Sequence, residues 1–111
     1  NYAGEFPLWL APVQVRLLPV SEAQRDYANE VVKTLVGKGY RAEVDVSGAR
    51  LGKQIRTAEL EKIPVTAVIG QREVESQSLS IRTRKSGDLG ALAVSEVIEK
   101  LEGAIAQKNA F

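Results

Sequence analysis

The sequence predicts a three-layer α/β/α sandwich, in which a mixed sheet of five strands is flanked by three helices. Three observations lead to this fold class. Strand-like and helix-like segments alternate over the first two-thirds of the 111 residues, which is typical of βαβ units with a parallel sheet. An unbroken apolar run at 65–69 has the length and composition of a buried central strand. Alternating polar and apolar residues at 73–84 indicate a half-exposed hairpin.

The first half of the chain is expected to form strand, helix and strand. Alternating residues predict a strand over 13–18. Ser21 and Gln24 have the spacing of a capping box, so we expect a helix that begins there and ends at Gly37. A second alternating segment, 40–46, predicts the next strand. A right-handed crossover would place these two strands in parallel.

The second half is expected to add two further helices around the hairpin. Apolar residues at helical spacing predict a helix over 51–63, which Pro64 ends. The central strand 65–69 follows. Residues 86–88 are expected to form a loop, and a last amphipathic helix is predicted over 93–107. Ligands of such sheets tend to bind beyond the carboxyl ends of parallel strands, here near Pro19, Gly48 and Gly70.

The predicted hairpin carries the most informative charges. A turn at Gln77 and Ser78 would place Glu73 opposite Arg82 and both on the outer face, with apolar residues facing the core. Two interpretations stay open. One is a surface ion pair, which contributes about 0–1 kcal/mol. The other is a recognition surface, because a carboxylate accepts from nucleobase amino groups and a guanidinium donates to guanine or phosphate.

The composition excludes most catalytic chemistry. The chain has no cysteine and no histidine, so thiol chemistry, histidine bases and common zinc ligands are absent. No phosphate-binding glycine motif is present, and Glu73 and Glu75 lie on a strand expected to be exposed. We therefore predict no catalytic residues and no metal site. Residues 49–88 hold eight basic and five acidic side chains, a mild excess that favours a polyanionic partner.

Several short motifs along nearly the whole chain form a consistent set. They are Phe-Pro-Leu-Trp-Leu-Ala-Pro-Val-Gln at 6–14, Gly-Tyr-Arg at 39–41, Arg-Leu-Gly-Lys-Gln-Ile-Arg at 50–56, Lys-Ile-Pro at 62–64, Glu-Val-Glu at 73–75, Ile-Arg-Thr-Arg at 81–84 and Asp-Leu-Gly at 88–90. Together they resemble the C-terminal anticodon-binding domain of class II threonyl-tRNA synthetases. The resemblance implies a mixed five-stranded sheet with three helices, which agrees with the fold class predicted above.

The resemblance also implies a division of the chain and its biochemical role. Residues 1–12 would be a linker from a catalytic domain outside this sequence, and residues 13–111 the anticodon-binding domain. The linker is expected to be extended, with Trp9 packed either on this domain or on the missing one. The ATP and zinc of the family belong to the catalytic domain, so no cofactor and no catalysis are expected here. The first residue, an asparagine, is consistent with a fragment.

Eight residues are assigned to RNA binding. Glu73 and Arg82 match the acidic and basic residues that contact the G and U of the threonine anticodon. Gly48 stands where many members have a base-contacting Asn, and we expect a main-chain group to substitute for it. The full assignment is Glu73, Arg82, Arg72, Arg84, Arg50 and Gly48 for the anticodon, and Lys53 and Lys85 for phosphates.

The expected partners follow from the same resemblance. They are threonine tRNA, through its anticodon loop, and the catalytic domain of the parent chain, with no membrane. The parent is expected to be a homodimeric, ATP-dependent ligase in the cytoplasm, with an organelle as the other location, and the fragment a monomer. The alternative is a protein-interaction module of the same fold, for which retention of both Glu73 and Arg82 would be unnecessary.

Overall fold

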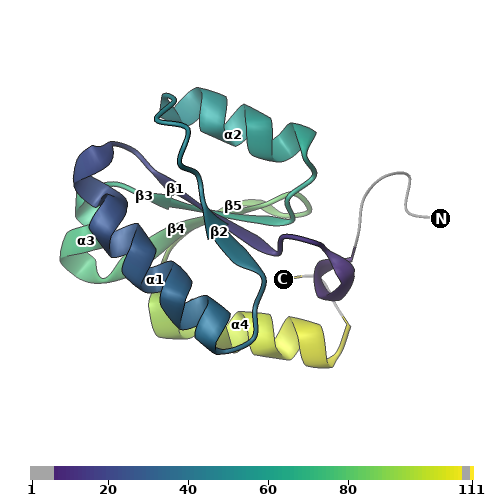
Figure 1. The fold of residues 1–111 in the computed structure, drawn as a ribbon. Coiled ribbons are helices and arrows are strands. Elements are labelled where there is room, and N and C mark those ends of the chain that lie inside the picture. The colour runs from purple at the N-terminus through teal and green to yellow at the C-terminus, as the bar shows by residue number, and fades with distance from the viewer. Residues whose placement is uncertain (1–6, 109–110) are drawn as a thin grey trace.

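The computed structural model describes residues 7–108 and residue 111, which form a five-stranded sheet flanked by helices (Figure 1). The strands are β1 (Val15–Pro19), β2 (Ala42–Val44), β3 (Val65–Ile69), β4 (Ser78–Thr83) and β5 (Gly87–Ala93). The helices are α1 (Arg25–Gly37), α2 (Leu51–Leu60), α3 (Gln71–Ser76) and α4 (Val94–Ala106), and the 3-10 turns are η1 (Leu8–Leu10) and η2 (Glu22–Gln24).

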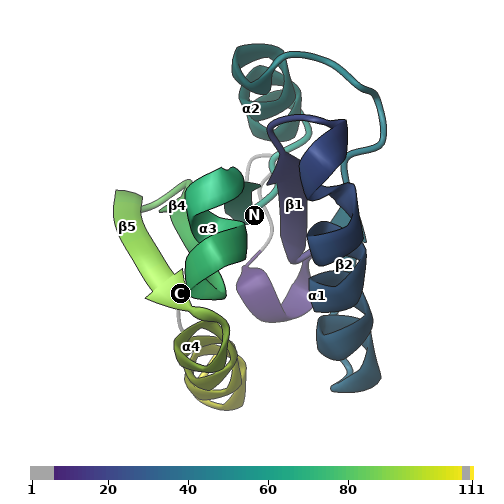
Figure 2. The same cartoon turned by 90° about the vertical axis from the view of Figure 1, so that its left-hand side faces the viewer.

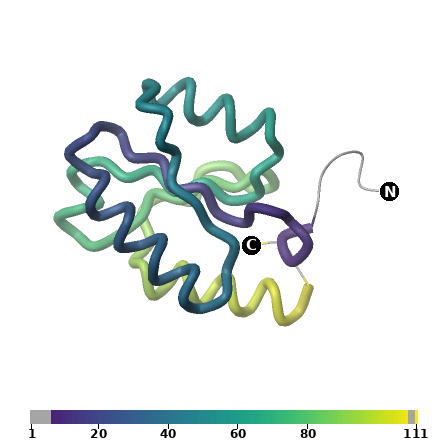
Figure 3. The backbone as a smooth tube through the Cα atoms, viewed as in Figure 1, coloured from purple at the N-terminus to yellow at the C-terminus, as the bar shows by residue number. Residues whose placement is uncertain are grey.

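The sheet has the predicted mixed topology, with strand order β2-β1-β3-β4-β5. β1 is parallel to β2 and to β3, whereas β4 is antiparallel to both β3 and β5. The crossover through α1 passes over one face of the sheet, and the crossover through α2 passes over the other (Figure 3). The predicted mixed sheet of five strands is therefore confirmed, with β4 and β5 as an antiparallel pair on one edge.

The apolar core lies between the sheet and the layer formed by α1 and α4 (Figures 1 and 2). Alternate residues of the strands point into this layer because successive side chains in a strand face opposite sides. Leu17 and Ile81 are fully buried there, as are Leu35 of α1 and Leu101 of α4. The amphipathic patterns predicted for the first and last helices thus correspond to one shared core.

The other face of the sheet is polar along one row. The strand registers place Arg16 next to Glu43 and Thr66, Thr66 next to Arg82, and Arg82 next to Asp88. Paired residues on neighbouring strands share a face. This polar row (Glu43, Arg16, Thr66, Arg82, Asp88) therefore crosses all five strands on the side that carries α2.

Arg16 holds α2 onto that face. It is only 7% exposed, its Nε donates to Glu43 over 2.7 Å, and its Nη2 donates to Glu61 at the end of α2 over 2.6 Å. Burial opposes the positive charge, but the hydrogen bonds to Glu61 and Glu43 outweigh it and raise the pKa of Arg16. A buried arginine is tolerated only when such partners compensate for the lost hydration.

The predicted hairpin over 73–84 is wrong in position. Residues Gln71–Ser76 form α3, and Gln77 ends it with a left-handed φ of 56°. The true hairpin joins β4 to β5 through a turn at 84–86, where Gly87 has a φ of 73°. The expected loop at 86–88 instead begins β5. Three alternating residues were too short a pattern to distinguish a strand from one helical turn.

Two further expectations need correction. The three predicted helices are present, but α3 makes a fourth. The lead-in segment is not extended throughout, because Leu8–Leu10 form the 3-10 turn η1 and Leu8 is buried in the core. Phe6 lies outside the described residues. Trp9 is half-buried, with Lys108 Nζ 4.9 Å from its ring centroid.

Leucine truncations on α4 and α2 test the position of the core. Leu101→Ala should lower the free energy of unfolding by about 2–5 kcal/mol, because it leaves a cavity in a close-packed site. The matched control is Leu60→Ala, since Leu60 is 75% exposed, and it should change stability by no more than about 0.5 kcal/mol. Urea unfolding measures both, and similar effects of the two substitutions would contradict this assignment of the core.

Candidate nucleic-acid interface

Glu73 lies on α3 because its carboxylate caps the start of that helix. The backbone N–H of Gly70 donates to Glu73 Oε1 over 2.7 Å. An acidic side chain in the first turn also interacts favourably with the helix dipole. Gly70 followed three residues later by Glu73 is a capping-box spacing, and this signal in the sequence could have predicted the helix.

The predicted cross-strand pairing of Glu73 with Arg82 is wrong. Arg82 is in β4, and its neighbours on the adjacent strands are Thr66 and Asp88. No hydrogen bond or ion pair engages the Arg82 guanidinium within the part of the chain that the structure describes. Its side chain is half-buried in the polar row and remains available to a ligand.

A groove of about 560 Å³ lies between α3 and the strands β4 and β5. Its volume is in the range of pockets that accept small-molecule groups. Arg72 and Glu73 lie together on its α3 side, and Ser80 follows on β4, two residues before Arg82 on the same face of the sheet. The lining residues are Arg72, Glu73, Glu75, Ser76, Ser78, Ser80 and Ala91. The groove thus offers hydrogen-bond donors and acceptors, and it contains both positively and negatively charged side chains.

Tyr27 joins α1 to the floor of this groove. Its hydroxyl donates to the carbonyl oxygen of Ser78 over 2.8 Å. Burial, and to a smaller extent the negative charge of Glu73, raises the pKa of Tyr27. The contact with Ser78 could not be predicted, because nothing in the local sequence connects Tyr27 to a strand 51 residues away.

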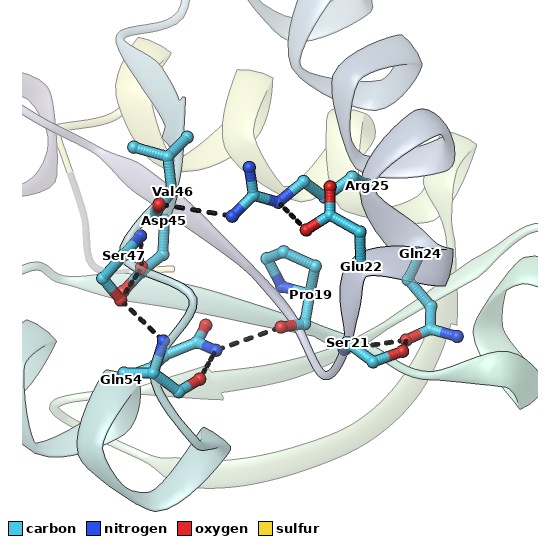
Figure 4. Close-up of polar contacts among 10 residues, drawn as sticks. Pro19, Ser21, Glu22, Gln24, Arg25, Asp45, Val46, Ser47 and Gln54 are labelled. Atoms are coloured by element: carbon cyan, nitrogen blue, oxygen red, sulfur yellow. Dashed lines mark hydrogen bonds and ion pairs between the residues drawn. The ribbon is translucent and has the colours of Figure 1, made fainter.

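The loop before α2 carries two more of the assigned residues, Gly48 and Arg50. Asp45 Oδ1 accepts from the backbone N–H and the hydroxyl of Ser47, over 2.8 and 2.6 Å. Gly48 then takes a φ of 72°, which strains any other residue. The exposed Arg50 is the N-cap residue of α2. Figure 4 shows this loop beside the end of β1.

Gln54 fastens that loop to the end of β1. Its amide nitrogen donates to the carbonyl oxygens of Pro19 and Ala49, over 3.0 and 2.7 Å (Figure 4). Its own oxygen is buried with no partner among the described residues. The loop after β1 is similarly joined to α3, since Gln24 donates to Gln71 over 3.5 Å. These hydrogen bonds bring together the loops that follow the three parallel strands, near which a ligand was expected to bind.

Arg84 and Lys85 lie at the opposite end of β4. Arg84 Nη1 donates to the carbonyl oxygen of Glu59 near the end of α2, over 2.8 Å. Lys85 is exposed in the hairpin turn. The fold therefore brings Arg72 and Glu73 into one groove, with Arg82 on the adjoining sheet, but places Arg84 and Lys85 at a distance along the strand. Their assigned roles in RNA binding stay predictions.

Other kinds of site find little support in the described residues. No three acidic side chains come together there in a way that could hold a metal ion. None of the described helices combines the length and the apolar character that crossing a membrane requires. What the described surface does offer is charged and polar hydrogen-bonding groups.

The family model "Anticodon binding domain" matches residues 14–103, and this chain belongs to that family. It is also similar to threonine–tRNA ligases over its whole length, which confirms the resemblance predicted from the sequence. It is 56% identical to the Synechocystis sp. enzyme over 100% of this chain and 59% identical to the Synechococcus elongatus enzyme over 97%. It spans 18% of the length of each.

Solved structures agree with the fold. The RNA binding domain of threonyl-tRNA synthetase from Cryptosporidium parvum superposes with a TM-score of 0.86 and 29% identity, over 91% of this chain and 26% of that one. Prolyl-tRNA synthetase from the same organism gives a TM-score of 0.81 at 24% identity, over 94% of this chain and 22% of that one. The latter supports the fold alone.

Substitutions of Glu73 separate its capping role from its charge. Glu73→Ala should lower the free energy of unfolding by about 0.5–2 kcal/mol, because the Gly70 N–H loses its acceptor. Glu73→Gln keeps an acceptor oxygen and should cost less. Urea denaturation measures both, and an equal loss in the two variants would indicate that charge, and not the hydrogen bond, stabilises α3.

The raised pKa of Tyr27 predicts a loss of stability in alkali. The unfolded chain releases the phenolic proton near pH 10, while the folded chain holds it to higher pH. The free energy of unfolding is therefore retained below about pH 10 and falls as the pH rises through the folded pKa. Tyr27→Phe should reduce this decline, measured by unfolding at pH 8 and pH 11. An unchanged decline would contradict the prediction.

Proposed function

We propose that this chain binds the anticodon loop of threonine tRNA and reads its G and U bases. The observation that carries the proposal is the groove beside α3, where Arg72 and Glu73 lie next to the sheet face that presents Arg82. Membership of the anticodon binding domain family and similarity to threonine–tRNA ligases over the whole chain support it.

The chemistry of the groove suits an unstacked base. Anticodon loops expose base edges, which proteins read by hydrogen bonds and stacking. The Arg82 guanidinium can donate in a fork to guanine O6 and N7. Glu73 uses one carboxylate oxygen for Gly70, which leaves the second to accept from a base amino or imino group. With only 5% aromatic residues, hydrogen bonding should contribute more than stacking.

The remaining assigned residues extend this proposal. Gly48 and Arg50 would contact the loop from the β2–α2 connection, with a main-chain group at Gly48 in place of a side chain. Arg84 would add a further anticodon contact, and Lys53 and Lys85 would bind phosphates. Gly48, Arg50 and Lys53 lie at the start of α2, whereas Arg84 and Lys85 lie in the turn at the far end of β4, so the RNA would meet the two groups at separate points.

The relatives are longer than this chain and are named threonine–tRNA ligases. We propose accordingly that the whole protein is a cytoplasmic, homodimeric ligase that attaches threonine to tRNA. Its catalytic domain would use ATP and zinc and would adjoin residues 1–12 of this chain. This domain would position the tRNA, without catalysing a step itself.

Binding of a threonine anticodon stem-loop tests the proposal, with a second loop whose central G is changed as its specificity control. Arg82→Ala should weaken binding of the cognate loop by about 1–3 kcal/mol and remove the preference between loops. Arg82→Lys keeps the charge without the fork and should lose the preference as well. Lys85→Ala should weaken both loops alike. Thermal unfolding of each variant confirms that the fold is retained.

Three outcomes distinguish the possibilities. A preference that survives in Arg82→Ala would assign base reading to other residues. Equal binding of the two loops by the unsubstituted chain would mean that it supplies charge and no base selection. Absence of binding at low salt would overturn the proposal in favour of a protein-interaction module.

A further inference from the structure

The outer side of α2 carries basic side chains that no described acidic group neutralises. Arg50, Lys53 and Arg56 are exposed and follow each other at intervals of three residues, which places neighbours on one side of a helix. None of the three forms an ion pair among the described residues. The first turn of α2 contains no acidic residue, and Glu59 is its one carboxylate.

The helices on the opposite face have a different charge balance. α4 holds three glutamates and one lysine, and α1 holds two acidic and two basic side chains. With its N-cap residue, α2 holds three basic side chains and one acidic one. The three helices therefore differ in charge, with α2 basic, α1 neutral and α4 acidic, although the net charge of the chain is only +1. A polyanion is attracted to the α2 side and repelled by α4.

The α2 side is also the side on which the sheet is partly uncovered. α2 packs against β1, whereas among the described residues α3 contacts β4 and no helix lies across both β4 and β5 on that face. Arg82 is half-buried there, and Asp88 and Ala91 are exposed. Helix α2 and the polar row that contains Arg82 therefore lie on the same side of the sheet (Figures 1 and 2).

We infer that the solvent side of α2 is a phosphate-binding track for the RNA backbone, with Arg56 as a phosphate contact beside Lys53. The inference rests on the proposed function and adds to it the direction from which the RNA approaches. The bases enter the groove beside α3 while the sugar-phosphate chain runs along α2. Contacts of this kind carry no base information, but they neutralise phosphates and release bound counterions.

A charge-matched pair of double variants tests the track. Lys53→Gln with Arg56→Gln removes two positive charges from exposed positions of α2. Lys33→Gln with Lys100→Gln removes the same charge from exposed positions of α1 and α4 on the other face. Affinity for the threonine anticodon stem-loop is measured between 50 and 200 mM salt. The α2 pair should reduce the slope of log affinity against log salt by about 1.4–1.8, and each single substitution by about half. The control pair should leave the slope unchanged.

Each outcome distinguishes this inference from the function on which it rests. Equal slope changes in the two double variants would overturn the track while leaving RNA binding established. Loss of the preference for the cognate loop in the α2 pair, at an unchanged slope, would assign these side chains to bases and overturn the phosphate role. If the unsubstituted chain does not bind the stem-loop at low salt, both the proposed function and the phosphate-binding track are overturned.

Discussion

The buried guanidinium of Arg16 is the interaction on which the two faces of this sheet depend. It lies in β1, between β2 and β3, and is held by Glu43 on β2 and by Glu61 at the end of α2. Because Arg16 bonds to Glu61 at the end of α2, this helix is held against β1. On the same side, no helix among the described residues lies across β4 and β5, and Arg82 is presented there.

The two faces of the sheet are stabilised in different ways. The side that carries α1 and α4 contains nearly all of the apolar core and is held by close packing. The α2 side is held partly by charge and hydrogen bonds, which leaves polar groups near the surface. A nucleic acid needs such groups, because its backbone attracts positive charge and its bases present donors and acceptors.

Glu73 combines a structural role with the recognition role proposed for it. One of its oxygens accepts from Gly70 and fixes the start of α3, which orients the carboxylate beside the groove. A side chain held in this way loses little further entropy when it binds a ligand. The same hydrogen bond stabilises the fold whether or not RNA is bound. The stability and the RNA affinity of each Glu73 variant must therefore be measured separately.

The sequence by itself determined the order of the main elements, the mixed five-stranded sheet and the family. These follow from local patterns: alternating strands, helical periodicity, the capping box at Ser21 and the unbroken run at 65–69. The resemblance also identified Arg72, Glu73 and Arg82 as one candidate group. Patterns of this kind repeat over several residues and depend little on distant parts of the chain.

Only the tertiary structure decided how those residues are brought together. Three alternating residues at 73–75 suit a strand as well as a helix, and the capping by Gly70 resolves the choice in favour of α3. The neighbours of Arg82 are Thr66 and Asp88 because β3 and β5 pair with β4, and strand pairing is a long-range property. The same holds for Tyr27 with Ser78 and for Gln54 with Pro19, since backbone carbonyls at the end of a strand carry no signature in the sequence.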